Sequence, residues 1–267
     1  MKVVMPPVKE YALEKGLNIY QPESLKNGEL IPVLESEKPD LIVVVAYGKI
    51  LPEYILNYPR FGCINLHGSI LPKLRGSAPI QWSVINGDEY AGASTMFMDV
   101  GLDTGDVIDV CKTRVGDEET AGELHDRIAL EGAKLLADTV DKIFEGKATR
   151  TPQNEEEATY APMLTKAMGK IDFDRPAKEI YNQIRGLNPW PVAYLETNKG
   201  TLKVYSAVVV DETSVGTAGE IVEKKNALVV QTGLGKIELK EVQLQGKKRM
   251  AAGDFLRGAG DLCIITE

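Results

Sequence analysis

The chain changes its pattern of apolar residues near its middle, and this change most constrains how it can fold. Before residue 148, short apolar runs alternate with segments of helical period, as in βα units with a mainly parallel sheet. After residue 166, short β-rich runs are separated by Gly, Asn and Asp, as in a small closed barrel. The sequence therefore predicts an α/β domain over residues 1–148, a linker over 149–166 and a small OB-like β-barrel domain over 167–267.

Local patterns predict the elements of both domains. Apolar residues at roughly helical spacing indicate one long amphipathic helix over residues 120–144, and shorter helices are expected over 8–16 and 175–187. The expected strands of the first domain are residues 41–46, which we interpret as a buried strand, 63–67, 93–99 and 106–113. Those of the second domain are 193–197, 202–210, 219–224, 227–232, 236–244 and 262–267.

Composition and charge exclude several classes of protein. The 267 residues contain no apolar run near the ~20 residues of a membrane span, and residues 1–10 lack the apolar stretch of a secretory signal, so we expect a cytoplasmic protein. A net charge of −8 argues against indiscriminate binding of nucleic acid. Residues 1–147 hold 15 basic and 23 acidic residues, whereas 148–267 hold 16 of each, so contact with a polyanion is expected mainly in the C-terminal part.

The three cysteines predict neither a zinc site nor a disulfide framework. Cys63, Cys111 and Cys263 lie far apart in the sequence and form no CxxC pair. We expect three free thiols on half-buried residues.

Asn65 and His67 are the first candidates for chemistry. His67 ends a predicted strand and precedes a loop rich in Gly, Ser and Pro, and open α/β sheets bind ligands at the carboxyl ends of their strands. Strand residues two apart project on the same side, so Asn65 faces the same substrate as His67. An Asn amide donates to a developing oxyanion and an imidazole accepts a proton from an attacking amine, which together suit acyl transfer. A histidine that merely ends a strand is the alternative reading.

The loop DVGLDTGD supplies carboxylates at Asp99, Asp103 and Asp106. Three acidic residues suggest a metal site, but the regular ligand series of a calcium loop is absent, so no metal is expected. The favoured role is a carboxylate that orients His67 and stabilises its protonated form. A glycine-rich turn with a capping Asp is the alternative.

Two separated segments, INLHGSILPKLRGSAPIQWSVINGD and TMFMDVGLDTGDVI, resemble the signature region of the 10-formyltetrahydrofolate-dependent formyltransferases. Two C-terminal segments extend the resemblance to the family members that formylate methionyl-tRNA: YAPMLTKAMGKIDFDRPAKEIYNQIRGLNPWPVAY and LQGKKRMAAGDFLRG. The resemblance covers the chain from about Val8 to Gly258. The resemblance implies a Rossmann-like catalytic domain, 10-formyltetrahydrofolate as co-substrate and initiator methionyl-tRNA as acceptor.

Site residues follow from the resemblance one by one. The catalytic set falls on Asn65, His67 and Asp103, and the folate-site motif falls on Ser69, Ile70, Leu71 and Pro72. In the implied mechanism the methionyl amine attacks the formyl carbon, Asn65 and protonated His67 stabilise the oxyanion, and Asp103 orients His67.

Several further residues are candidates for binding. Ile50 and Leu51 are expected either to wall the pterin or to pack in the core. His125 is expected to be a surface residue on the long helix. Candidates for contact with tRNA phosphates are Lys166, Lys170, Lys247, Lys248 and Arg249, with solvated lysines as the alternative.

The family pattern begins with a strand, a helix, a second strand and a basic loop before the helix that matches residues 8–16. Compared with that pattern, this chain lacks about forty residues, which include the first two strands. In a doubly wound sheet the first strands lie centrally. We therefore expect an N-terminally truncated form with an open sheet edge and uncovered apolar faces. The alternatives to formylation of methionyl-tRNA are formylation of an amino sugar or small amine, and an inactive fragment that still binds folate or RNA.

Overall fold

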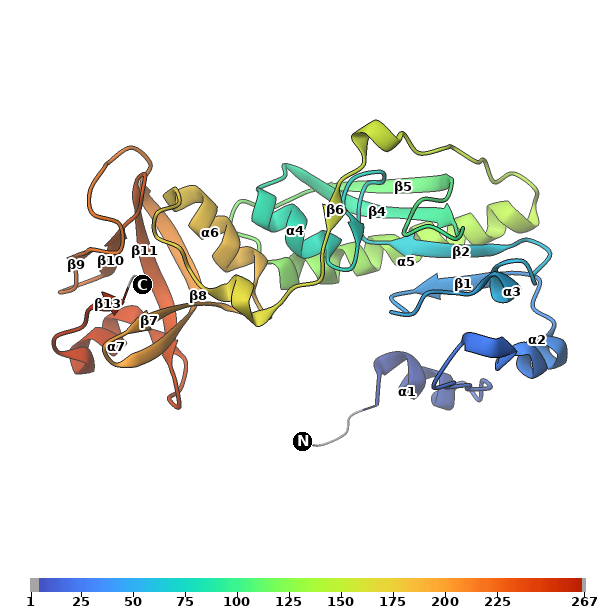
Figure 1. Ribbon diagram of the computed structural model, residues 1–267, viewed down its shortest axis with the longest axis horizontal. Helices are drawn as coiled ribbons and strands as arrows, with labels where there is room; N and C mark the ends of the chain where they lie inside the picture. Colours follow the sequence, from blue (N-terminus) through green and yellow to red (C-terminus); the bar gives the residue numbers. More distant parts are fainter. Residues whose placement is uncertain (1–4, 266–267) are drawn as a thin grey trace.

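The structure of the chain is a computed structural model that describes residues 5–265. It is elongated, with the first sheet and its helices toward one end and a second sheet at the other end (Figure 1). The elements of the first half are α1 (Pro7–Glu14), η1 (Lys26–Gly28), α2 (Ile31–Glu37), β1 (Ile42–Val45), α3 (Glu53–Leu56), β2 (Cys63–His67), β3 (Arg75–Gly76), α4 (Pro79–Asn86), β4 (Tyr90–Phe97), β5 (Val107–Arg114) and α5 (Ala121–Phe144). No helix within the described range is both long and apolar enough to cross a membrane.

The first sheet has four strands in the order β1-β2-β4-β5. Strands β1 and β2 are parallel, whereas β2 pairs with β4, and β4 with β5, in antiparallel fashion. The expectation of a mainly parallel sheet is therefore wrong for the described strands. The short loop 98–106 accounts for the antiparallel pairing of β4 with β5, because a parallel connection needs a crossover of roughly a dozen or more residues.

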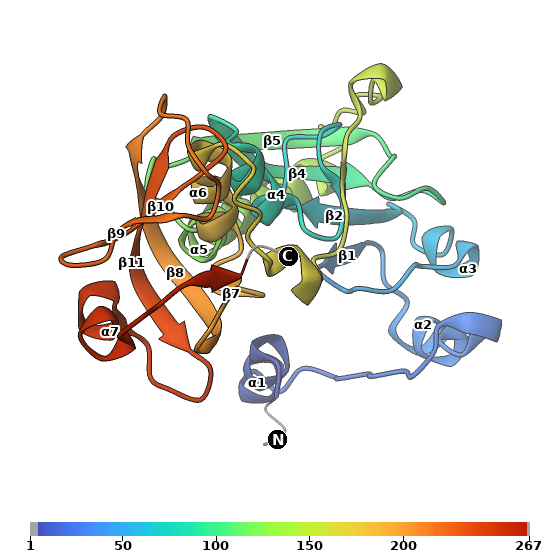
Figure 2. The same ribbon diagram turned by 60° about the vertical axis from the view of Figure 1, so that its left-hand side comes forward.

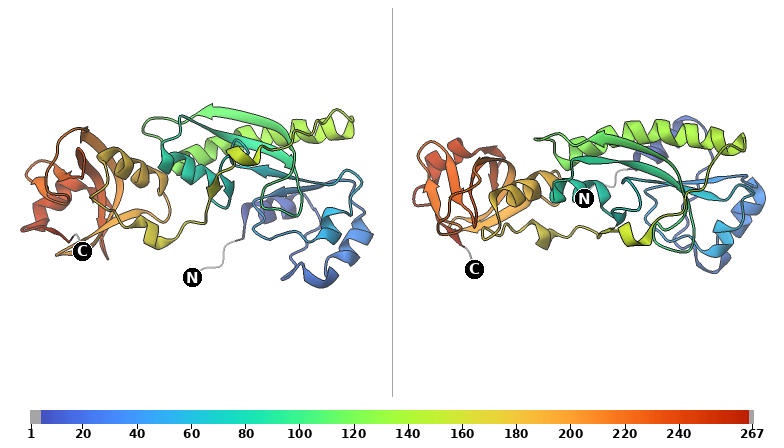
Figure 3. Two further views of the ribbon diagram at one scale, coloured as in Figure 1. Left: turned by 45° about the horizontal axis from the view of Figure 1, so that its top comes forward. Right: turned by 90° about the horizontal axis from the view of Figure 1, so that it is seen from above.

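Helix α5 covers one face of this sheet (Figure 3). It begins after Thr120, whose hydroxyl accepts a hydrogen bond from the Glu123 amide while the Glu123 carboxylate accepts one from the Thr120 amide. Gly132 allows the close approach, since a Cβ there would lie 3.2 Å from a methyl carbon of Leu66. Ile64 and Leu66 of β2 both pack in clusters that include α5 residues.

Strand β1 is the edge of the sheet, and its prediction as a buried strand is wrong. Ile42 and Val44 pack on the face covered by α2 and α3, in a cluster with Leu34. Val43 and Val45 point to the other face and are 41% and 52% exposed. Helix α5 packs on β4 and β5 instead, so this side of β1 remains uncovered, as expected for an open edge.

The segment between the halves is extended and lies beside the loop after β2 (Figure 2). It contains η2 (Glu155–Glu157), β6 (Tyr160–Ala161) and η3 (Lys166–Gly169). Strand β6 pairs in parallel with β3, Arg75 opposite Tyr160 and Gly76 opposite Ala161. The linker is thereby hydrogen-bonded to the first half.

The second half is a seven-stranded antiparallel sheet that curls around its own core as a nearly closed barrel. The order of its described strands is β13-β7-β8-β11-β10-β9, and β12 pairs with β11 outside this path. The elements are α6 (Ala177–Gly186), β7 (Ala193–Thr197), β8 (Gly200–Asp211), β9 (Ile221–Glu223), β10 (Leu228–Gln231), β11 (Lys236–Leu244), β12 (Met250–Ala251), α7 (Ala252–Ala259) and β13 (Ile264–Ile265).

The last segments of the chain differ from the sequence prediction in two ways. Helix α7 was not expected, and it buries Ala252, Phe255 and Ala259 on one side. The strand expected over 262–267 is shorter, and residues 266–267 lie outside the described residues.

Candidate functional site

Asn65 and His67 project from the face of β2 opposite α5. Their neighbours Ile64 and Leu66 pack toward α5, so strand alternation turns Asn65 and His67 to the other side. The two side chains therefore lie on the same face, as the sequence predicted, with His67 at the end of the strand.

His67 is 6% exposed, and both of its ring nitrogens have protein neighbours. Nε2 donates a hydrogen bond to the carbonyl of Leu74 at 2.9 Å, because a carbonyl oxygen can only accept. Nδ1 lies 3.6 Å from Oδ2 of Asp103. Nε2 is thus the protonated nitrogen of the neutral ring, and Nδ1 is the nitrogen left to accept a proton.

The Asn65 side chain differs from His67, since it is half-buried and makes no hydrogen bond to any other residue within 5–265. A buried or half-buried amide normally finds a partner. The Asn65 amide is therefore available to donate to a bound molecule.

Asp103 differs from its acidic neighbours Asp99 and Asp106 in the groups that it contacts. Its Oδ2 accepts a hydrogen bond from the Gly76 amide at 2.8 Å. Asp99 accepts from the Gly101 amide and the Thr104 hydroxyl within its own loop, and Asp106 lies 3.5 Å from a guanidinium nitrogen of Arg150. Within the described part of the chain, no three His, Cys, Asp or Glu side chains form a group that could hold a metal ion.

The SILP motif forms a tightly bonded loop after β2. The Ser94 hydroxyl donates to the Ser69 carbonyl at 2.7 Å and accepts from the Leu71 amide at 3.1 Å, while the Ser69 hydroxyl donates to the Lys73 carbonyl at 2.6 Å. Ser69 and Leu71 are buried, and Ile70 and Pro72 are half-buried. The motif thus divides into residues that hold the loop and residues that can meet a ligand.

Ile50 and Leu51 have different environments. Ile50 is 85% exposed, whereas Leu51 is 8% exposed and packs in the cluster with Ile55. In this structure Leu51 is a core residue. Ile50 alone of the two has a side chain that a ligand could reach.

Sequence reasoning missed the residues that hold the Asp103 loop from the linker side. Arg75 is fully buried and bonds to Gln153 and Glu155, and Gln153 in turn bonds to the backbone of the Asp103 loop. The hydrogen bond to Glu155 raises the pKa of Arg75, and the same bond lowers the pKa of Glu155. Arg75 follows the SILP motif closely in the sequence, and this proximity was the signal that could have identified it.

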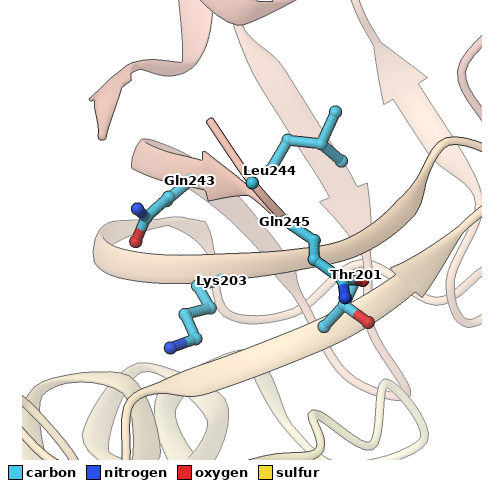
Figure 4. A pocket seen from close by; sticks show the side chains of 6 residues that line it. Thr201, Lys203, Gln243, Leu244 and Gln245 are labelled. Atoms are coloured by element: carbon cyan, nitrogen blue, oxygen red, sulfur yellow. The ribbon is translucent and has the colours of Figure 1, made fainter. Parts of the chain in front are cut away.

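The basic residues proposed for tRNA contact are exposed: Lys166, Lys170, Lys247, Lys248 and Arg249. Arg249 lies over the Tyr205 ring at 4.1 Å and pairs with Glu241. A hollow of about 320 Å³ lies between β8 and the end of β11, next to these basic residues in the sequence (Figure 4). It is lined by Thr201, Lys203, Gln243, Leu244, Gln245 and Gly246. His125 is exposed on α5, as expected, with Nδ1 3.2 Å from Oδ1 of Asp126.

The cysteines differ in burial. Cys63 is buried, Cys111 is half-buried and Cys263 is exposed, and all three are free. The expectation of uniformly half-buried thiols holds only for Cys111. Burial raises the pKa of the Cys63 thiol to about 11.

Residues 3–140 match the formyl transferase family, and residues 163–260 match the formyl transferase C-terminal domain. The chain is 52% identical over 253 residues to the methionyl-tRNA formyltransferase of Agathobacter rectalis, covering 94% of this chain and 82% of that protein. It is 44% identical over 259 residues to the methionyl-tRNA formyltransferase of Acetivibrio thermocellus, covering 96% and 83% of the two chains.

Solved structures share the fold at lower identity. An N-formyltransferase from Helicobacter canadensis, in complex with folinic acid and dTDP-3-aminofucose, superposes with a TM-score of 0.65 at 20% identity, covering 86% of this chain and 81% of that one. HypX from Aquifex aeolicus, in complex with tetrahydrofolic acid, gives 0.61 at 16% identity, covering 85% and 40%. These likenesses concern the fold alone, and they agree with the α/β domain plus barrel that the sequence predicted.

Proposed function

This chain belongs to the formyl transferase family, and from that premise we propose that it transfers a formyl group from 10-formyltetrahydrofolate to the α-amine of initiator methionyl-tRNA. The high identity to methionyl-tRNA formyltransferases over nearly the whole chain supports this acceptor. The observation that carries the chemistry is His67 Nδ1 beside the Asp103 carboxylate, next to the unpartnered Asn65 amide.

Each proposed catalytic residue has a separate task. As the amine attacks the formyl carbon, a C–N bond forms and the carbonyl oxygen becomes an oxyanion, to which the Asn65 amide donates. His67 exchanges the amine proton through Nδ1, since Nε2 is held by the Leu74 carbonyl. Asp103 keeps the ring oriented and lies beside the positive charge that arises on it.

The reaction ends when the bond from the formyl carbon to N10 of the folate breaks. The proton taken from the amine passes by way of His67 to N10, which leaves as a neutral amine. This sequence of steps needs no covalent bond to the enzyme. Protonated His67 also contributes to stabilising the oxyanion between the two steps.

The folate is proposed to lie against the SILP loop. Ile70 and Pro72 are the half-buried members of the motif and would contact the pterin, and the exposed Ile50, which precedes α3, would add a further contact. Ser69 and Leu71 would act by holding the loop in shape.

The tRNA is proposed to contact the second half. We keep the proposed division into a catalytic domain over 1–148, a linker over 149–166 and a tRNA-binding domain over 167–267. Exposed basic residues at 166, 170 and 247–249 supply the charge that phosphate contact requires. The hollow beside Lys203 adjoins part of that charge, because its lining residues Gln243 to Gly246 directly precede Lys247 in the chain. Such an enzyme would act in the cytoplasm, where charged tRNA is found.

The test is a transfer assay with a panel of acceptors. The purified chain is incubated with 10-formyltetrahydrofolate and either methionyl initiator tRNA or a nucleotide-linked amino sugar, and formylated product is measured. We expect formyl-methionine with the tRNA, no product with the sugar, and loss of activity in His67→Ala. Formylation of the sugar instead, or a folded chain that binds folate or RNA without transferring, would refute the proposal.

A further inference from the structure

Arg75 is a fully buried cation whose guanidinium is held by two linker residues. Its Nε and Nη2 donate to Oε1 of Gln153 at 3.0 and 2.9 Å, and its Nη1 and Nη2 donate to the two carboxylate oxygens of Glu155 at 2.9 and 2.8 Å. A buried charge is costly unless it is paired and hydrogen-bonded. These bonds join the loop after β2 to a part of the chain about eighty residues further on.

Gln153 continues the connection from Arg75 to the Asp103 loop. Its Nε2 donates to the carbonyls of Asp103 and Gly105, both at 2.8 Å. The amide of Gln153 therefore uses its oxygen for Arg75 and both of its N–H groups for the loop, and it can adopt only this orientation.

Asp103 needs such support because its backbone is strained. Its φ of +55° is in the left-handed region, which non-glycine residues rarely adopt. Conformations of this kind persist where the surroundings hold them, and they concentrate at functional sites. Here the Asp103 carbonyl is held by Gln153 and its carboxylate by the Gly76 amide.

We propose that Arg75, Gln153 and Glu155 form a latch that positions the Asp103 carboxylate for His67. The linker is then part of the catalytic machinery as well as a tether between the halves. Gln153 is a positioning residue, since it acts through Asp103, whose Oδ2 lies 3.6 Å from Nδ1 of His67. The catalytic consequence of this latch rests on the proposed function, whereas the hydrogen bonds that form the latch do not depend on it.

Gln153 is the best residue to change, because removal of the buried Arg75 could prevent folding. Gln153→Ala removes both halves of the connection. Gln153→Glu keeps an acceptor for Arg75 but sets a carboxylate against the Asp103 and Gly105 carbonyls. Glu156→Gln is the matched control, since Glu156 is exposed in the same linker and its side chain makes no hydrogen bond to another described residue.

The first measurement is hydrogen exchange on the full chain without substrate. We expect Gln153→Ala to speed exchange of the Gly76 amide, which donates to Asp103, by about tenfold or more, with no change in Glu156→Gln. This readout holds whether or not the chain transfers formyl groups. Unchanged exchange in Gln153→Ala, or equal acceleration in the control, would overturn the latch.

The second measurement is formyl transfer. We expect both Gln153 variants to lower kcat by roughly 10- to 100-fold with KM for the folate changed by less than about twofold, as for loss of a group that orients a catalytic residue. The pH profile of kcat should shift in Gln153→Ala but not in Glu156→Gln. Faster exchange with unaltered kcat and pH profile would overturn the positioning role, whereas absence of transfer by the parent chain would count against the proposed function alone.

Discussion

The carboxyl end of β2 and the segment before β1 are held in place in different ways. Around His67, loops from three parts of the chain are joined by hydrogen bonds of the Leu74 carbonyl, the Gly76 amide and the Gln153 amide. In the segment before β1, helix α1 has no buried residue. A hydrophobic cluster that includes Leu25 and Leu34 attaches this segment to the sheet, together with hydrogen bonds from the Tyr54 and Tyr58 hydroxyls to the Leu25 and Leu34 carbonyls.

This difference shows where the geometry of the site comes from. The proposed catalytic residues are held by β2, its following loop and the linker, and none of their described polar contacts comes from residues 5–40. The early segment covers one face of β1 and β2 and leaves Val43 and Val45 exposed at the sheet edge. Changes in the two regions should therefore affect different properties.

The largest difference is expected in the rate of formyl transfer. His67→Ala should lower kcat/KM by about 10²- to 10⁴-fold, since it removes the group that moves the proton. Tyr11→Ala on exposed α1 should leave the rate within about twofold. Initial rates with charged tRNA measure both, and thermal melting checks that each variant folds. Comparable losses in the two variants would remove the distinction between the regions.

The next largest effect concerns opening of the early segment, which Cys63 reports. Its thiol is buried and donates to the carbonyl of Ile55 at 3.6 Å, and its raised pKa of about 11 keeps it protonated at neutral pH. In a Cys111→Ser, Cys263→Ser background, Leu34→Ala should speed labelling of Cys63 by a thiol reagent about thirtyfold or more, since it weakens the cluster by roughly 2–5 kcal/mol.

The same variant should leave the site loops unchanged. Hydrogen exchange across residues 99–106 should be the same in Leu34→Ala and in its parent. If Cys63 reacts only when the whole protein unfolds, the early segment is not an independent unit.

A smaller effect is expected at the open sheet edge. Val45→Lys should reduce self-association, because a charge on an edge strand opposes pairing with another chain, while the free energy of unfolding changes by less than about 0.5 kcal/mol. Leu130→Lys on the exposed side of α5 is the control. Light scattering measures association, and an equal reduction in both variants would show that added charge alone is responsible.

The smallest effect is a pH dependence of the latch. The hydrogen bond from Arg75 lowers the pKa of Glu155 below its ordinary value of 4.5, so the pair contributes stability above that value and loses it as pH falls through the lowered pKa. The Tm difference between the parent and Glu155→Gln should be constant from pH 7 to about 5 and shrink below about 4.5. A difference that grows on acidification would contradict this sign.

Sequence patterns predicted the elements that depend on local periodicity. Strands β2 and β11 have the predicted bounds and α5 begins one residue later, because alternation and helical spacing are properties of neighbouring residues. The exposure of β1 was missed, since an apolar run has the same pattern whether or not a helix covers it.

Contacts between distant parts of the chain were harder to predict. The pairing of β3 with β6, and the bonds of Arg75 to Gln153 and Glu155, join segments whose sequences are polar and lack a period. Helix α7 was missed because it is short and contains Gly253 and Gly258, which weaken a helical pattern. The roles of Asn65, His67 and Asp103 stay predictions, although the structure brings His67 and Asp103 together.

The proposed function places formyl transfer at the carboxyl end of β2. Substitution of Asn65 is the sharpest test of this placement, because no other described side chain bonds to its amide. The measurement is single-turnover formylation of methionyl-tRNA by the parent chain and Asn65→Ala at saturating 10-formyltetrahydrofolate. We expect Asn65→Ala to lower the rate by about 10²- to 10³-fold with unchanged thermal stability. A rate within about threefold of the parent would contradict it, because such an amide would stabilise no oxyanion.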